Sequence, residues 1–181
     1  MGAAAVAVAV DTQREQDMRF LPLTRLLDDL VTVLLQVSPD AYVTRPVPAV
    51  SGSIGQHVRH ILDHVSVFAQ MNGSALVTYD TRERGTAVET DLGAAISVIL
   101  GLKMSLAHRR DLSPNAVVNV DLRISRSQSV IGRSSVAREL AYVVSHTIHH
   151  QALIAILLAL QGYGAPADFG VAPSTPRFGH S

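Results

Sequence analysis

The sequence predicts an all-α protein, a four-helix bundle with a small β-hairpin and an irregular C-terminal tail. Three observations lead to this fold class. Apolar residues recur at helical spacing in four separate stretches, each bounded by residues that cap or break helices. Hydrophobic residues make up 48% of the chain and charged residues 17%, which favours a compact core over disorder. One short segment alternates apolar and polar side chains, as half-buried strands do.

The first two predicted helices cover residues 23–37 and residues 53–71. Pro22 suits the first turn of the first helix, where a missing N–H is tolerated. Ser53 followed three residues later by Gln56 matches a capping box at the start of the second helix. Each helix is expected to bury one apolar face against the others.

The last two predicted helices cover residues 92–110 and the stretch Val136–Leu160, the latter capped by Ser134 or Ser135. Between these helices, residues 116–124 alternate in the manner of a strand, and the seven residues that follow are expected to pair back on them. The result is a short hairpin between the third and fourth helices.

The remaining segments are interpreted as connections and termini. Residues 77–89 are polar and predict a loop, and the aperiodic tail 169–177 is expected to lie over the helices. Residues 1–15 are expected to form a leader whose first ten residues are apolar, too short to span a bilayer and without the basic region of a signal peptide. We therefore expect a flexible leader followed by one cytoplasmic domain over residues 16–181.

Charge and cysteine content exclude several functions. Lys plus Arg and Asp plus Glu both number 15, so the formal net charge is zero and no basic surplus indicates nucleic acid or a membrane surface. The absence of cysteine excludes disulfides, a cysteine nucleophile and thiolate metal ligands. A metal would therefore be held by histidine, carboxylate or water, and we expect neither a nucleic-acid nor a membrane partner.

Histidines gather in the second and fourth predicted helices. His146 and His150 are four residues apart, so they project from one helix face on successive turns. This spacing presents two imidazoles to one metal ion. A third histidine from the second helix would complete a site with an open coordination position, and His57, His60 and His64 all qualify by helix geometry.

The alternatives for these side chains are structural. A single buried histidine usually forms a hydrogen bond in the core, and metal binding is preferred here because two helices direct histidines inward. Glu139 precedes His146 by about 10 Å along the helix axis, too far to bind the same ion. It is expected to cap the helix start or to pair with an arginine such as Arg82 or Arg84. The side chains expected to support the ligands or line the cavity are His57, Asp63, His64, Glu139, Tyr142 and His149.

Two sets of motifs resemble the DinB-like (YfiT-like) metal-binding superfamily. One is Ser53-Ile54-Gly55-x4-His60-x2-Asp63 with His146-x3-His150-x-Ala-Leu-Ile, and the other, similar to a bacterial subgroup, is Tyr79-Asp80-x-Arg82-x-Arg84 with Phe169-Gly-Val-Ala-Pro-Ser-Thr. The resemblance covers nearly the whole chain after the leader. It implies a four-helix bundle, zinc or nickel bound by His60, His146 and His150, and often a homodimer. The charged run at Tyr79 either shapes the mouth of the site or forms a solvated loop.

The resemblance implies several reactions and leaves the substrate open. Members of the superfamily include thiol S-transferases that use glutathione, mycothiol or bacillithiol, isomerases of the maleylpyruvate type, and hydrolase-like proteins. The first hypothesis is a metal-dependent enzyme whose three-histidine site activates water or an external low-molecular-weight thiol for transfer or hydrolysis. The second is a non-catalytic, stress-associated bundle that binds a metal or small ligand. A weaker third is an iron-dependent oxygenase, although no carboxylate is placed to complete the usual iron triad.

Overall fold

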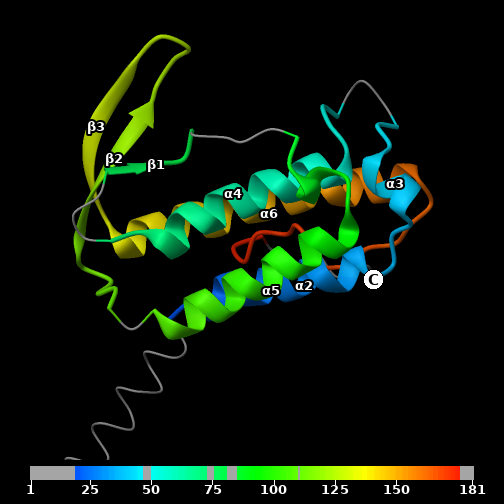
Figure 1. Ribbon diagram of the computed structural model, residues 1–181, viewed down its shortest axis with the longest axis horizontal. Helices are drawn as coiled ribbons and strands as arrows, with labels where there is room; N and C mark the ends of the chain where they lie inside the picture. The colour runs from blue at the N-terminus through cyan, green and yellow to red at the C-terminus, as the bar shows by residue number, and fades with distance from the viewer. Residues whose placement is uncertain (1–18, 47–49, 73–75, 81–84, 110, 176–181) are drawn as a thin grey trace, which may run out of the picture.

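The computed structural model describes residues 19–46, 50–72, 76–80, 85–109 and 111–175 (Figure 1). The predictions for the leader, for residue 110 and for the last residues of the tail lie outside this part of the chain. Along the described residues the elements are α2 (Leu21–Leu34), α3 (Pro39–Val43), α4 (Ile54–Gln70), β1 (Leu76–Thr78), the 3₁₀ helix η1 (Ala87–Glu89), α5 (Leu92–His108), β2 (Val117–Arg123), β3 (Ser129–Ser135) and α6 (Val136–Leu160).

The predicted all-α four-helix bundle is wrong, because a three-stranded mixed sheet is built onto the helices. The hairpin expected between the last two long helices is present, with β2 and β3 antiparallel from Val117 opposite Ser135 to Arg123 opposite Ser129. β1 was predicted as loop, yet it pairs parallel with β2 and gives the order β1-β2-β3. A three-residue strand is too short for its alternation to be recognised, and its partner lies far along the chain.

The long helices begin where side chains satisfy their first backbone N–H groups. The Ser53 hydroxyl accepts from the backbone N–H of Gln56, and the Gln56 side chain accepts from the backbone N–H of Ser53, which confirms the predicted capping box of α4. Ser135 caps α6 by accepting from the backbone N–H of Arg138 at 3.2 Å. After the end of α2, Ser38 caps the short helix α3 by accepting from the backbone N–H of Ala41.

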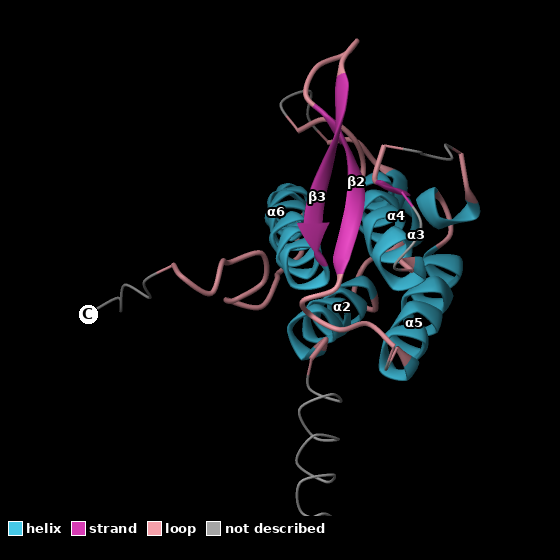
Figure 2. Ribbon diagram, turned by 90° about the vertical axis from the view of Figure 1, so that its left-hand side faces the viewer, coloured by secondary structure: helices cyan, strands magenta, loops and turns pink. Residues whose placement is uncertain are grey.

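Helix α6 packs against two other long helices. It lies side by side with α4, and α2 also packs against it (Figure 1). Val143, Ile154 and Leu157 on α6 are completely buried. Length and apolar composition alone would let α6 span a membrane, and a helix in the middle of a protein core meets the same criteria. Figure 2 shows the β2–β3 hairpin standing away from the helices at the end where α6 begins.

The described part of the C-terminal tail packs on the helices, as its sequence predicts. Phe169 is buried in the core. Gly170 has a φ of 76°, and a Cβ at this position would lie 2.4 Å from the backbone nitrogen of Ala152 in α6. Only glycine allows both this backbone conformation and this close approach to the helix.

Candidate metal centre

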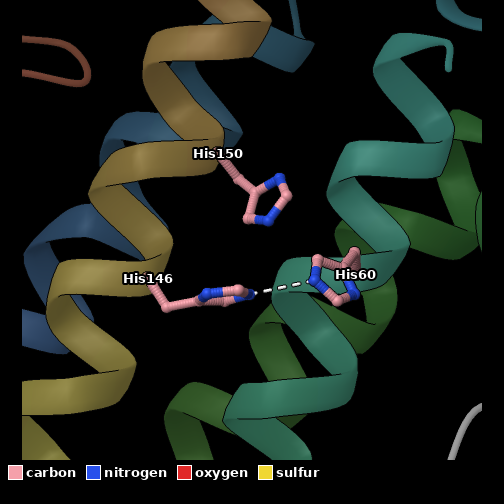
Figure 3. Close-up of side chains that lie close together, drawn as sticks. All are labelled: His60, His146 and His150. Atoms are coloured by element: carbon pink, nitrogen blue, oxygen red, sulfur yellow. Dashed lines mark hydrogen bonds between the residues drawn. The ribbon is translucent and has the colours of Figure 1, made fainter. Parts of the chain in front are cut away.

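Three histidines from two helices meet between α4 and α6. His60 projects from α4, and His146 and His150 project from successive turns of α6 (Figure 3). One ring nitrogen of each histidine lies within 4.8 Å of those of the other two, and none of the three residues is fully exposed. The structure therefore brings together the three residues that the motifs single out.

The spacing of these nitrogens fits one small cation. Nε2 of His60 and Nε2 of His146 are 3.0 Å apart. Two nitrogens bound at 2.0–2.1 Å to one tetrahedral zinc ion would lie about 3.4 Å apart, so small rotations of the rings would make room for an ion. Three histidine ligands would leave one tetrahedral position for water or substrate.

Burial favours the neutral form of His150, which is the form that can bind a cation. The pKa of His150 is lowered to about 3, first by burial and then by the charges that neighbouring histidines would carry. Burial is also the main cause that lowers the pKa of His57. A neutral imidazole offers a lone pair to a metal, whereas a protonated imidazole does not.

His57 holds the ring of His150 from behind. The Nδ1 atoms of the two rings share a hydrogen bond of 3.0 Å, and His57 is buried. Because Nδ1 of His150 is engaged, Nε2 is the nitrogen that faces His60 and His146 (Figure 3). Metal-binding histidines commonly donate their second ring N–H in this way, which sets both the tautomer and the ring orientation.

His64 supports the other side of the cluster. Its ring stacks on that of His146, with 3.9 Å between centroids and 24° between planes. Its Nδ1 lies 3.0 Å from the backbone carbonyl oxygen of His60, one turn earlier in α4. His64 therefore supports the ring of His146. It lies beside the predicted ligands and is not one of the three.

Two further residues named from the sequence lie outside the three-histidine group. Asp63 forms an ion pair of 2.8 Å with Arg59 on its own helix. Arg59 also pairs with Glu89 of η1 at 2.8 Å, which links α4 to the loop beside it. His149 is exposed, and its ring makes an edge contact with the ring of His150.

A cavity of about 580 Å³ opens beside the histidines, between the sheet and the first half of α6. His146 and His64 form part of its wall, together with Tyr79 and Tyr142. His57, His60 and His150 line a second hollow of about 410 Å³, which shares no lining residue with the first cavity. The candidate centre is therefore bordered by space for a small molecule and is not sealed in the core.

Glu139 lies on the wall of the larger cavity and is only 6% exposed. It accepts a hydrogen bond of 2.5 Å from the hydroxyl of Ser134, whereas the expected pairing with Arg82 or Arg84 lies outside the described residues. Burial is the main cause that raises the pKa of Tyr79, and the charge of Glu139 and a side-chain hydrogen bond with Glu139 raise it further.

Sequence reasoning missed several residues of this cavity. Ser134, Arg133 and Arg138 line it, and none was named as a site residue. The sequence could have indicated these residues, because β3 continues directly into α6. The last residues of the strand therefore lie next to the first turn of the helix.

The fold and the site define a mainly helical protein with a small mixed sheet and a three-histidine centre beside a cavity. No family model matches the chain, and no solved structure matches it. The chain is similar to a protein of Rhizopus delemar named FK506-binding protein 5, with 34% identity over 110 residues. The match covers 58% of this chain and 29% of that relative, so the chain spans less than a third of its length. This match does not bear on the resemblance to the DinB-like superfamily.

Proposed function

We propose that this protein is a divalent-metal-dependent enzyme of the DinB-like type, in which His60, His146 and His150 hold zinc or nickel. The proposal depends on one observation, the convergence of one nitrogen from each histidine to within 4.8 Å. The motifs that resemble the superfamily support the same three ligands. A homodimer and a cytoplasmic location belong to the same proposal.

A bound ion with an open position would lower the pKa of a water or thiol on it to near neutrality and so supply a nucleophile. The chain has no cysteine, so a reacting thiol must come from an external, low-molecular-weight co-substrate. His57 and His64 keep two of the ligand rings in place, and the cavity of about 580 Å³ offers room for the second substrate. The reaction class is therefore thiol transfer or hydrolysis.

The second candidate is a non-catalytic, stress-associated protein that uses the site for stability or sensing. The hydrogen bond between the Nε2 atoms of His60 and His146 favours this candidate, because the two rings satisfy each other without a ligand. The adjoining cavity favours the enzyme, since structural zinc sites fill all four positions and need no space for a substrate.

Metal analysis of protein purified without a nickel column tests the proposal. The wild-type protein is expected to carry about one equivalent of zinc or nickel, and His146→Ala is expected to lose it. His149→Ala is the matched control, because His149 is exposed on the same helix and outside the triad. Full metal content in His146→Ala would refute the proposed ligand set.

A thiol-transfer screen then separates the two candidates. Metal-loaded protein is supplied with glutathione, mycothiol or bacillithiol and a fluorogenic electrophile such as monochlorobimane. Turnover that disappears in His146→Ala supports the enzyme. A metal-dependent rise in melting temperature without turnover on any thiol would favour the non-catalytic protein.

A further inference from the structure

Glu139 is a buried carboxylate that two hydroxyl groups hold in place. It accepts a hydrogen bond of 2.5 Å from the hydroxyl of Ser134, the last residue but one of β3. The side chain of Tyr79, which directly follows β1, forms a second hydrogen bond with Glu139. A buried carboxylate needs such donors, and these two come from opposite edges of the sheet. Glu139 therefore ties both edge strands to the first turn of α6.

The ring of Tyr79 is held from a second direction by His64. The two rings stack with 5.3 Å between their centroids and 9° between their planes. A tyrosine side chain has two rotatable bonds, so a contact at the hydroxyl and a contact on the ring face together restrict it to one orientation. The hydrogen bond with Glu139 thus fixes the surface on which the His64 ring packs.

The stack continues from His64 to a predicted metal ligand. The His64 ring lies 3.9 Å from that of His146, with 24° between the planes. Tyr142 packs on His146 as well, with 5.7 Å between centroids and 25° between planes, and its ring lies 5.0 Å from that of Tyr79. Four aromatic rings therefore form one packed cluster, and His146 is the member of it that belongs to the three-histidine group.

We propose that Tyr79, anchored by Glu139, is a positioning residue that sets the ring orientation of His146 through His64. The inference rests on the proposed metal centre, because it concerns how well one ligand is aimed. A histidine binds a metal along the lone pair of one ring nitrogen, so a rotation of the ring weakens the bond. Side chains that restrict this rotation contribute to metal affinity without touching the ion.

The proposal gives the short strand β1 a role in the site. β1 pairs parallel with β2, with Thr78 opposite Asp121, and this pairing determines where the next residue, Tyr79, lies. Tyr79 then contacts the start of α6 through Glu139 and the middle of α4 through His64. The sheet is thereby connected to the candidate metal centre.

The charge of Glu139 offers a competing explanation. A carboxylate attracts a cation, and Glu139 precedes His146 by seven residues of helix, or about 10 Å along the axis. Glu139→Gln separates the two explanations, because it removes the charge and keeps a side-chain oxygen that can accept from Tyr79. The positioning role predicts that this variant keeps its metal affinity, and the charge effect predicts a loss.

The zinc affinity and the visible absorption of the cobalt-loaded, full-length protein test the proposal together. Tyr79→Leu removes the ring and keeps apolar bulk, and Glu139→Ala removes the anchor and keeps the ring. Both are expected to weaken zinc binding about three- to tenfold, the size of one aromatic contact, and to change the cobalt spectrum, which depends on ligand geometry. Glu139→Gln is expected to match the wild-type protein in both measurements.

Tyr42→Phe is the matched control. Tyr42 is a buried tyrosine whose hydroxyl donates a hydrogen bond of 2.7 Å to the backbone carbonyl oxygen of Val88, and it does not belong to the four-ring cluster. Its replacement is expected to lower the melting temperature and to leave the zinc affinity and the cobalt spectrum unchanged. A merely structural role of Tyr79 would give this same result.

Wild-type zinc affinity and a wild-type cobalt spectrum in Tyr79→Leu would overturn the inference. An equal loss in Glu139→Gln and Glu139→Ala would overturn it too, by assigning the effect to charge. If Glu139→Ala does not fold, Tyr79→Phe takes its place, because it keeps the ring and removes the same hydrogen bond. A wild-type spectrum in Tyr79→Phe would then contradict the anchoring by Glu139.

Nuclear magnetic resonance of the metal-free protein separates this inference from the proposed function. Tyr79→Leu is expected to shift the imidazole signals of His64 and His146, because it removes a ring stacked on the first and lets the second rotate, and Tyr42→Phe is expected to leave them in place. These shifts in a protein that binds no metal would refute the metal enzyme and leave the packing of His146 by Tyr79 standing. Metal binding that Tyr79→Leu leaves unchanged would refute the positioning role alone.

Discussion

Replacing His57 tests whether the candidate centre depends on a residue that does not itself bind the metal. His57→Phe keeps an aromatic ring of similar shape but removes the nitrogen that shares the 3.0 Å hydrogen bond with Nδ1 of His150. The Nδ1–H of His150 is then left without its partner, and the ring loses the contact that aims Nε2 at the other ligands.

The expected effect is on metal affinity and not on ligand number. Loss of a supporting hydrogen bond of this kind weakens metal binding about 10- to 100-fold, or by about 1.4–2.7 kcal/mol. The affinity is measured by competition with a chromogenic zinc chelator at pH 7.5. His57→Gln is expected to recover part of the loss, because its amide oxygen accepts a hydrogen bond.

His149→Ala provides the control for general effects of removing a histidine from this region. His149 is exposed, lies outside the three-histidine group and meets the His150 ring in an edge contact, so zinc affinity is expected to change little. Wild-type affinity in His57→Phe, or no recovery in His57→Gln, would refute the role given to this hydrogen bond.

Three further outcomes are expected. Because the folded-state pKa of His150 is lowered to about 3, its stabilising contribution is complete above the unfolded-state pKa and is lost as the pH falls towards the folded value. The melting temperature of the metal-free protein should therefore fall between pH 7 and pH 5, and fall less steeply in His150→Gln; parallel curves would contradict this. Gly170→Ala should lower the free energy of unfolding by about 1–3 kcal/mol in a urea titration, since its Cβ would lie 2.4 Å from the backbone of Ala152 at a positive φ, whereas Gly164→Ala, in open space, should change it little. Ser53→Ala should cost about 1 kcal/mol by the same assay through loss of the helix cap, and an unchanged midpoint would show that the capping box is dispensable.

For the candidate ligands, the spacing of histidines along each helix predicts one part of the site, and the packing of the helices decides the rest. Helix spacing placed His146 and His150 on one face, and it left His57, His60 and His64 open as the third ligand. Packing of α4 against α6 brings Nε2 of His60 to 3.0 Å from His146. The same packing places Nδ1 of His57 3.0 Å from Nδ1 of His150.

The sequence by itself determined the features that depend on neighbours a few residues away. The capping box at Ser53 and the two-histidine face of α6 follow from contacts within one or two helical turns, and side-chain spacing encodes these directly. Only the tertiary structure decided the pairing of β1 with β2, and the cavity that Glu139 and Tyr79 line. These depend on segments far apart in the chain, whose approach is set by the packing of whole elements and not by any local preference.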